Sequence, residues 1–310
     1  MLWNSTVNSE IEPHQIFIEK GIWHDPARNQ RPVPYKIYTP QDSSSTAWPV
    51  VVWSHGLGGS RDGAGFISRY VASHGYVVVH IQHEGTDSSL WEGKPGHPWD
   101  IIRAMHIPRK ATLQRFRDVP FALDQMEKSL TGKIDMTRLG FCGHSFGAMT
   151  TQVMAGQYRG AGRHRYQLTE PRIKAGILYS SGPAKHHSQY EGIRIPLMTM
   201  TGTDDASPLG EFKAEDRQDI FKHAHRSEQY MVVLEDGDHM VFNGSRGKLA
   251  ANPKRDVHER IIKVLSLAFW ESYLKNDQAA HAWLMGEGAR AWLGAEATYM
   301  YRAAATGTAA

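Results

Sequence analysis

The stretch RLGFCGHSFGAMTTQ, residues 138–152, sets a serine between two glycines where a short apolar run gives way to a helix-like one. Its central pentapeptide GHSFG, residues 143–147, fits the pattern G-x-S-x-G, a sharp strand-to-helix turn that lifts a serine hydroxyl clear of a sheet. Glycine is needed on both sides of this turn, because a side chain there would collide with the neighbouring strand or helix. Gly and Ser are common residues, so the value of the pentapeptide depends on what the rest of the chain supplies.

Short β-rich runs lie on both sides of this turn and alternate with helix-like segments. Six of the runs are rich in Val, Ile, Leu, Met and Tyr and mostly lack polar alternation, which is typical of strands buried on both faces. They are PVVVWSHG (49–56), YVVVHIQH (76–83), RLGFCGHS (138–145), AGILYSS (175–181), PLMTMTG (196–202) and QYMVVLED (229–236). Segments with apolar residues at three- and four-residue spacing are predicted to be amphipathic helices, and they cover 62–75, 109–130, 145–158 and 258–277. Two earlier runs, 14–25 and 33–40, are predicted to form an opening pair of strands.

This alternation predicts an α/β fold, with a mostly parallel sheet of about eight strands and helices on both faces. We expect a single domain over residues 1–302, followed by a low-complexity, disordered tail at 303–310. The connection at 84–108 is unusually long, and such loops tend to be functional or mobile. It either folds onto the core as a surface excursion or forms a lid or pocket wall. If it forms a lid or pocket wall, its Trp91 and Trp99 are candidate substrate-binding residues. If it folds onto the core, they cover the core.

The composition narrows the class of protein. The chain has 35 basic and 32 acidic residues, a net charge of +3, and no long run of like charges, which argues against a nucleic-acid partner. No stretch approaches the ~20 apolar residues of a membrane helix, and the N-terminus lacks the basic and apolar regions of a secretion signal. The single cysteine, Cys142, excludes an internal disulfide. We therefore expect a cytoplasmic protein without a transmembrane segment, and the oligomeric state is left open.

Candidate partners for the serine occur later in the chain. A serine hydroxyl is a poor nucleophile until a base takes its proton, and the base needs an acid that holds its tautomer. In sheets of this type the three groups follow strands in the chain order Ser, Asp or Glu, His. Asp204 and Asp205 follow the run at 196–202, and His239 follows the run at 229–236. The order and the strand-end positions predict a triad of Ser145, His239 and one of the two aspartates.

The oxyanion that forms when a serine attacks a carbonyl needs backbone N–H donors. One is expected from Phe146, directly after the serine. The second is expected from Leu57 in the glycine-rich segment WSHGLGGS, residues 53–60, which follows an earlier strand. The alternative for this segment is a tight turn without a catalytic role. His55 is predicted to hydrogen-bond within the loop and hold it.

Four segments carry a resemblance to a known superfamily, and they lie at 53–89, 143–150, 200–208 (MTGTDDASP) and 236–242 (DGDHMVF). They resemble the α/β-hydrolase superfamily, and most of all its platelet-activating-factor acetylhydrolase and dienelactone-hydrolase-like branch of bacterial esterases. The resemblance covers about residues 15–300 and implies an α/β-hydrolase fold. It implies Ser145 as nucleophile, His239 as general base, and Leu57 and Phe146 as oxyanion donors.

The triad acid is the open point in this resemblance. The pattern G-x-x-D, counted from Gly202, gives Asp205, whereas counting back four residues from Pro208 gives Asp204. We favour Asp205, because Gly202 ends the strand and fixes the start of the loop. Dienelactone hydrolase proper resembles a cysteine-nucleophile variant, from which Ser145 departs.

The expected function is that of a serine carboxylesterase acting on small-molecule esters with short acyl chains, through an acyl-enzyme and without a cofactor. Relatives on this branch cleave short or oxidised acyl chains from phospholipids, and others are carboxylesterases or polyester hydrolases. Phospholipid acetylhydrolase and polyester hydrolase are therefore the alternatives within the class. A ligand-binding protein of the same fold is the non-enzymatic alternative, disfavoured because every catalytic role has an occupant.

The 17 histidines raise the question of a metal site. Three pairs lie close together in the sequence, namely His80 with His83, His186 with His187, and His223 with His225. Neither H-E-x-x-H nor a cysteine-rich spacing accompanies them, and a structural zinc site usually draws on four ligands. We expect solvated surface histidines and no metal site. Arg115, Arg117 and Asp118 are likewise expected on a charged, solvated helix face.

Overall fold

The computed structural model describes residues 1–42, 47–160, 162–244 and 252–305. The strands are β1 (Ile16–Asp25), β2 (Arg31–Pro40), β3 (Trp48–Ser54), β4 (Val77–Ile81), β5 (Ile134–His144), β6 (Ile173–Tyr179), β7 (Leu197–Asp204), β8 (Gln229–Asp238) and β9 (Ala297–Arg302). The α-helices are α1 (Gly65–Ser73), α2 (Pro98–Arg103), α3 (Arg109–Ser129), α4 (Phe146–Met154), α5 (Asp219–His223), α6 (Arg255–Leu274), α7 (Gln278–Met285) and α8 (Glu287–Leu293).

The strands form one sheet in the order β1-β2-β4-β3-β5-β6-β7-β8-β9. The six strands from β4 to β8 in this order pair in parallel. The two strands at the start of the order and the last strand pair antiparallel. Because parallel strands need crossover connections, the helices between them cover both faces of the sheet.

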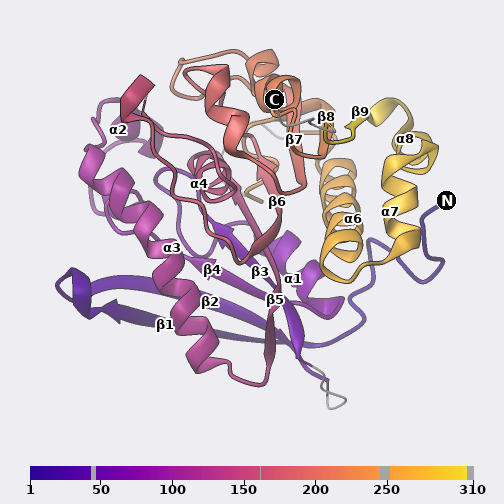
Figure 1. Cartoon of the computed structure of the whole chain (residues 1–310), viewed down its shortest axis with the longest axis horizontal. Coiled ribbons are helices and arrows are strands. Elements are labelled where there is room, and N and C mark those ends of the chain that lie inside the picture. Colours follow the sequence, from indigo (N-terminus) through magenta and orange to yellow (C-terminus); the bar gives the residue numbers. More distant parts are fainter. Residues whose placement is uncertain (43–46, 161, 245–251, 306–310) are drawn as a thin grey trace.

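Two apolar layers hold the helices against the sheet. Helices α1 and α6 pack on one face, where Tyr70 and Trp270 are almost completely buried. Helix α3 packs on the other face through Phe116 and Leu123, and α4 follows beside it. Figure 1 shows the sheet running through the molecule between these layers, with α6, α7 and α8 gathered on one side. The expected α/β-hydrolase fold, with a mostly parallel sheet, is confirmed.

The structure adds a ninth strand to the eight expected. Strand β9 pairs antiparallel with β8 from Ala297↔Leu234 to Arg302↔Gln229. Its burial is mixed, since it lies at the edge of the sheet. A short, half-exposed edge strand lacks the continuous apolar run that identifies the central strands. The single-domain organisation stays a prediction that the one sheet supports, and residues 306–310 of the predicted disordered tail lie outside the described residues.

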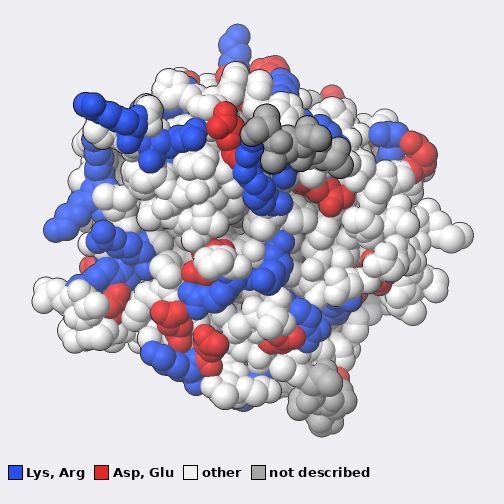
Figure 2. All heavy atoms as spheres, in the orientation of Figure 1, with Lys and Arg blue, Asp and Glu red and all other residues white. Residues whose placement is uncertain are grey.

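The surface carries both signs of charge. On the face drawn in Figure 2, basic and acidic side chains are interspersed between large uncharged areas. This mixture follows from the nearly balanced composition. Among the described residues, no helix combines the length and the apolar character that crossing a bilayer requires.

Candidate active site

Ser145 sits on a strained turn between β5 and α4. Its backbone has φ 57° and ψ −113°, and its N–H donates to the Tyr179 carbonyl at the end of β6 (2.8 Å). A non-glycine residue in such a conformation costs about 1–3 kcal/mol and persists only where its surroundings fix it. The flanking glycines supply that fixation. A Cβ on Gly143 would lie 2.6 Å from the Ser54 carbonyl oxygen, and a Cβ on Gly147 only 1.9 Å from the same atom.

The glycine requirement predicts a large loss of stability in Gly147→Ala. The added methyl group meets main-chain atoms of β3, which cannot move aside as a flexible side chain could, so we expect a loss of about 3 kcal/mol or more. Gly65→Ala is the matched control, because its Cβ would meet only the Tyr38 hydroxyl at 3.7 Å. Urea unfolding of the two variants measures the difference, and equal midpoints would contradict the close approach at the turn.

The structure brings Asp205 and His239 together. Asp205 follows β7, His239 follows β8, and the distance from His239 Nδ1 to Asp205 Oδ1 is 2.8 Å. Asp205 is completely buried, whereas its neighbour Asp204 is exposed and pairs with Asp238 along the strands. Of the two candidate acids, Asp205 is therefore the one beside the histidine.

Three side chains that the sequence did not point out hold the Asp205 carboxylate. Its Oδ2 accepts hydrogen bonds from Ser180 Oγ (2.6 Å) and Thr201 Oγ1 (2.8 Å). Its Oδ1 lies 2.8 Å from Arg217 Nε. A carboxylate fixed on both oxygens keeps its orientation toward His239.

Arg217 is a buried cation next to both catalytic candidates. Its Nη1 donates to the Ser180 carbonyl (2.6 Å), and its Nη2 lies 2.9 Å from His239 Nδ1. Burial lowers the pKa of Arg217, against the attraction of Asp205. In a polar segment, the sequence around a buried arginine does not differ from that around an exposed one, so no sequence signal indicates the burial of Arg217.

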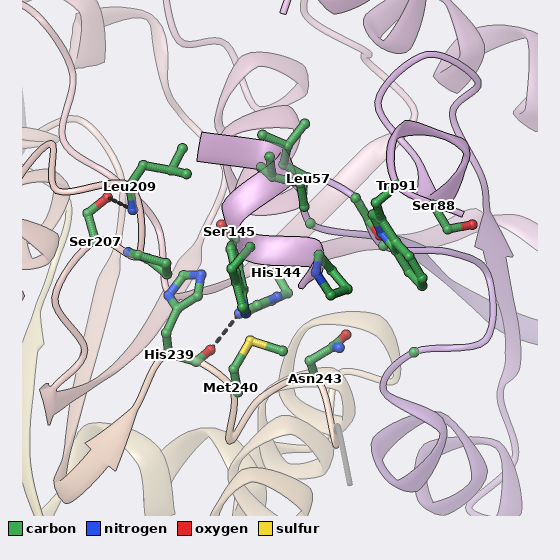
Figure 3. Close-up of a pocket in the computed structure, with 18 of the residues that line it drawn as sticks. Leu57, Ser88, Trp91, His144, Ser145, Ser207, Leu209, His239, Met240 and Asn243 are labelled. Carbon is green, nitrogen blue, oxygen red and sulfur yellow. Dashed lines mark hydrogen bonds between the residues drawn. The ribbon is translucent and has the colours of Figure 1, made fainter. Parts of the chain in front are cut away.

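The second ring nitrogen of His239 faces the cavity that Ser145 also lines, as Figure 3 shows. This Nε2 is buried and has no hydrogen-bond partner within the described part of the chain. In ligand-free sites, catalytic hydrogen bonds are often long and shorten when substrate binds. The backbone of His239 is held by His144, whose Nε2 lies 2.7 Å from its carbonyl oxygen. Burial keeps the pKa of His144 well below its usual range, so the neutral ring packs and donates as expected of a supporting residue.

The predicted oxyanion donors lie beside Ser145, where Leu57 lines this cavity and Leu57 and Phe146 line a second cavity that also contains the serine. Phe146 is the first residue of α4, where a backbone N–H has no partner inside the helix. Among the described residues, the N–H of Leu57 makes no hydrogen bond, whereas that of Gly58 donates to the Thr86 carbonyl (2.9 Å). Gly56 packs directly against the turn, since a Cβ there would lie 3.4 Å from Ser145 Cβ. Both N–H groups are therefore available beside the serine.

His55 holds the loop that carries Leu57, as predicted from the sequence. Its Nε2 accepts from the His83 N–H (3.0 Å), so its Nδ1 carries the proton and donates to the Gly56 carbonyl (2.6 Å). Burial holds the pKa of His55 well below its usual range and keeps the ring in this neutral form.

The charged residues of α3 correct one expectation. Arg117 is exposed, but Arg115 and Asp118 are completely buried beneath the Leu57 loop. Arg115 donates to Ser54 Oγ (2.8 Å) and to the His55 carbonyl. The periodicity of the sequence placed these residues on a solvated face. It could not show their burial, because their hydrogen-bond partners come from loops that are distant in the sequence.

Asp118 accepts hydrogen bonds from three residues in the same buried network, and Arg31 donates from both Nε and Nη2. It accepts from Arg28 Nη1 (2.7 Å), Arg31 Nε (2.8 Å) and His83 Nδ1 (3.1 Å). Although burial disfavours the charged form, the hydrogen bonds from Arg31 and His83 lower the pKa of Asp118. Burial and nearby Arg115 lower the pKa of His83 to about 4. His83 and its neighbour His80 are thus buried structural residues, not the surface histidines expected.

Two cavities meet at Ser145. The first, of about 520 Å³, is bounded by the 84–108 connection and contains His239. Trp91 and Trp99 line it, as the lid or pocket-wall interpretation requires, and Trp91 Nε1 donates to the Gly58 carbonyl (2.7 Å). The second, of about 540 Å³, adjoins the first along a shared wall and extends past Phe146 and Met149. Both volumes fall in the range of small-molecule sites.

A serine on a strand-to-helix turn, with a carboxylate and a histidine at the ends of later strands, is the arrangement of the α/β-hydrolase class. Two comparisons narrow this class. A family model described as platelet-activating factor acetylhydrolase, isoform II, matches residues 33–92, which include the Leu57 loop. The platelet-activating factor acetylhydrolase of the dog, Canis lupus familiaris, is 26% identical over 33% of this chain and 31% of its own length. The chain thus has the α/β-hydrolase fold and resembles the platelet-activating-factor acetylhydrolase branch, and the match spans less than a third of that relative.

Proposed function

We propose that this protein is a serine esterase that hydrolyses carboxylic esters of small molecules. Ser145 Oγ attacks the ester carbonyl while His239 Nε2 takes its proton, and Asp205 holds the histidine through Nδ1. The negative oxygen of the tetrahedral intermediate accepts hydrogen bonds from the N–H groups of Leu57 and Phe146. The intermediate collapses as His239 protonates the departing alcohol. Water then attacks the acyl-serine with His239 as base, which releases the acid and restores the serine.

The observation that carries this proposal is the 2.8 Å contact between His239 Nδ1 and Asp205 Oδ1. It leaves the opposite ring nitrogen buried without a partner among the described residues, in the cavity that contains Ser145. A ligand-binding protein has no need of a buried imidazole oriented by a carboxylate toward a strained serine. A fluorophosphonate probe tests the nucleophile directly, and the expected result is one covalent adduct on the peptide that contains Ser145. Adduct formation elsewhere, or none on the folded protein, contradicts the proposal.

The two cavities support short acyl chains. An ester has one group on each side of its carbonyl carbon, and two adjoining cavities of limited volume share Ser145 in their walls. The aromatic side chains of Trp91 and Trp99 confine the first of them. Rates on p-nitrophenyl acetate, butyrate, octanoate and palmitate are expected to peak at the short end. A maximum at palmitate would contradict the short-chain preference, and activity on polyester films alone would favour the polyester-hydrolase alternative.

A second candidate, phospholipid acetylhydrolase, rests on the relatives and on Arg159. This residue lines the second cavity and is partly buried, and burial lowers its pKa. No carboxylate pairs with it in the described part of the chain, although Glu211 also lines the cavity. An unpaired guanidinium suits the phosphate of an acetylated phospholipid. A much higher kcat/KM on 2-acetyl phospholipids than on neutral acetate esters would select this candidate.

Trp99→Ala is expected to move the chain-length preference toward longer acyl groups. The Trp99 ring lies 6.5 Å from the His239 ring and closes the first cavity beside the base. Removing it enlarges the apolar pocket, and each added methylene that becomes buried is worth about 0.8 kcal/mol. The octanoate-to-acetate ratio of kcat/KM should rise at least severalfold. Trp292→Ala, far along the chain on α8, is the matched control, and an equal ratio in both variants would remove Trp99 from the binding site.

A further inference from the structure

A cluster of metal-ligating side chains lies outside the catalytic site, between the loops that follow β6 and β7. His187 begins the short 3₁₀ turn at His187–Gly192, while Asp219 and His223 begin and end α5. His187 Nε2 lies 3.2 Å from Asp219 Oδ1, and His223 Nε2 lies 3.5 Å from the same oxygen. The ligand atoms of all three residues lie within 4.8 Å of one another. Two imidazole nitrogens and one carboxylate oxygen therefore lie close together.

The spacing of these atoms fits a first-row transition metal. Zinc binds imidazole nitrogen and carboxylate oxygen at about 2.0–2.2 Å, which places neighbouring ligand atoms of a tetrahedral site about 3.3–3.5 Å apart. The two nitrogen-to-oxygen distances agree with that separation. The rings of His187 and His223 also stack, with centroids 3.6 Å apart and planes 10° apart. The Nε2 lone pairs lie in the ring planes, so those of two parallel rings do not converge, and one ring has to turn out of the stack for both nitrogens to bind a single ion.

The carboxylate is oriented by a buried tyrosine. Tyr190 is fully buried, and its hydroxyl donates to Asp219 Oδ2 (2.8 Å), which leaves Oδ1 facing the two histidines. The same hydroxyl accepts from the Ala184 N–H (2.7 Å). Hydrogen bonds of this kind to the distant atom of a ligating carboxylate are a regular feature of metal sites.

We propose that His187, Asp219 and His223 bind a divalent transition-metal ion, with zinc as the preferred ion. The site joins the loop after β6 to the segment after β7, and both line the second cavity, through Ala184 on one side and Arg217 on the other. The three side chains leave one tetrahedral position for water, and a bound ion links the loop after β6 to the segment after β7. In the sequence, His186 is next to His187 and His223 is close to His225. In the fold, His187 lies beside His223, and Asp219 lies beside both.

Zinc titration of the chelator-treated, full-length protein tests the site. We expect isothermal calorimetry to show one saturable zinc equivalent that is absent from His187→Ala and from His223→Ala. At free zinc about 100-fold above Kd, Tm should rise by roughly 3–8 °C in the wild type and not in these variants. His187 is exposed, so its alanine variant is expected to fold, which circular dichroism verifies.

His186→Ala is the matched control, because it removes an adjacent exposed histidine that lies outside the cluster. It should retain the zinc equivalent and the rise in Tm. With many other histidines in the chain, further weak binding is expected in every variant, so the difference of one equivalent is the decisive quantity. An equal number of equivalents in wild type, His187→Ala and His223→Ala, or none in the wild type, overturns the proposal.

Discussion

Replacing Ser145 by alanine is expected to lower kcat for ester hydrolysis by roughly 10⁴-fold or more, the scale on which a triad nucleophile acts. The reason lies in the turn. Ser145 is held at φ 57° by its N–H bond to Tyr179 and by the close approach of Gly147 to β3, so its hydroxyl has a fixed place in the cavity. Ser145 alone occupies the apex of the turn, so no neighbouring hydroxyl can replace its hydroxyl when the serine is removed.

Initial rates on p-nitrophenyl acetate for wild type and Ser145→Ala, purified in parallel, measure this effect. Alanine occupies the same backbone conformation, so Tm should change little, and equal Tm values make the kinetic comparison valid. Residual activity above about a tenth of wild type would identify a different nucleophile. A folded wild type that turns over no ester in the panel would instead favour the ligand-binding alternative.

The central strands and the three catalytic candidates were predictable because their signals are local. Strands β3 and β4 are buried along almost their whole length and therefore read as uninterrupted apolar runs. Ser145, Asp205 and His239 each follow such a run within a few residues, and parallel strands bring their ends to one edge of the sheet. The position of each side chain then follows from the topology.

The supporting residues were not predictable, because their partners are distant in the sequence. Arg217 lies beside His239, 22 residues away, and donates to the Ser180 carbonyl, 37 residues away. Arg115 reaches back 60 residues to the His55 carbonyl. In the sequence Arg115 lies on the polar face of a predicted amphipathic helix and Arg217 lies in a polar segment, and an exposed position is the ordinary outcome for both. Only the tertiary structure shows that each is surrounded by acceptors.

The exchange of Asp205 for asparagine is expected to lower kcat by roughly 10³–10⁴-fold, because an amide cannot hold the tautomer that the carboxylate selects. The His239 Nδ1–H donates to Asp205 Oδ1, and this leaves Nε2 free to accept the serine proton. An asparagine amide can present its NH₂ group to Nδ1 and so favour the tautomer that is protonated at Nε2, which cannot act as a base. The effect is therefore on kcat and not on substrate binding.

Asp204→Asn is the matched control for this prediction. It makes the same chemical change one residue away, at an exposed position that contacts neither His239 nor Arg217 in the described structure. Its kcat and KM should remain within about twofold of wild type, since substitutions on an exposed surface rarely disturb a site. A crippling effect of Asp204→Asn together with a mild effect of Asp205→Asn would reverse the assignment of the acid.

Stability separates a catalytic role of Asp205 from a purely structural one. Its carboxylate also faces the buried Arg217, and removing one partner of a buried ion pair typically costs about 3–5 kcal/mol. Asp205→Asn is thus expected to lower Tm as well as kcat. Arg217→Met with Asp205→Asn removes both charges and should recover part of the lost Tm, because no unpaired buried charge remains. Since the tautomer of His239 still lacks its carboxylate, kcat should stay low in that double variant, and recovery of both quantities together would assign Asp205 to structure alone.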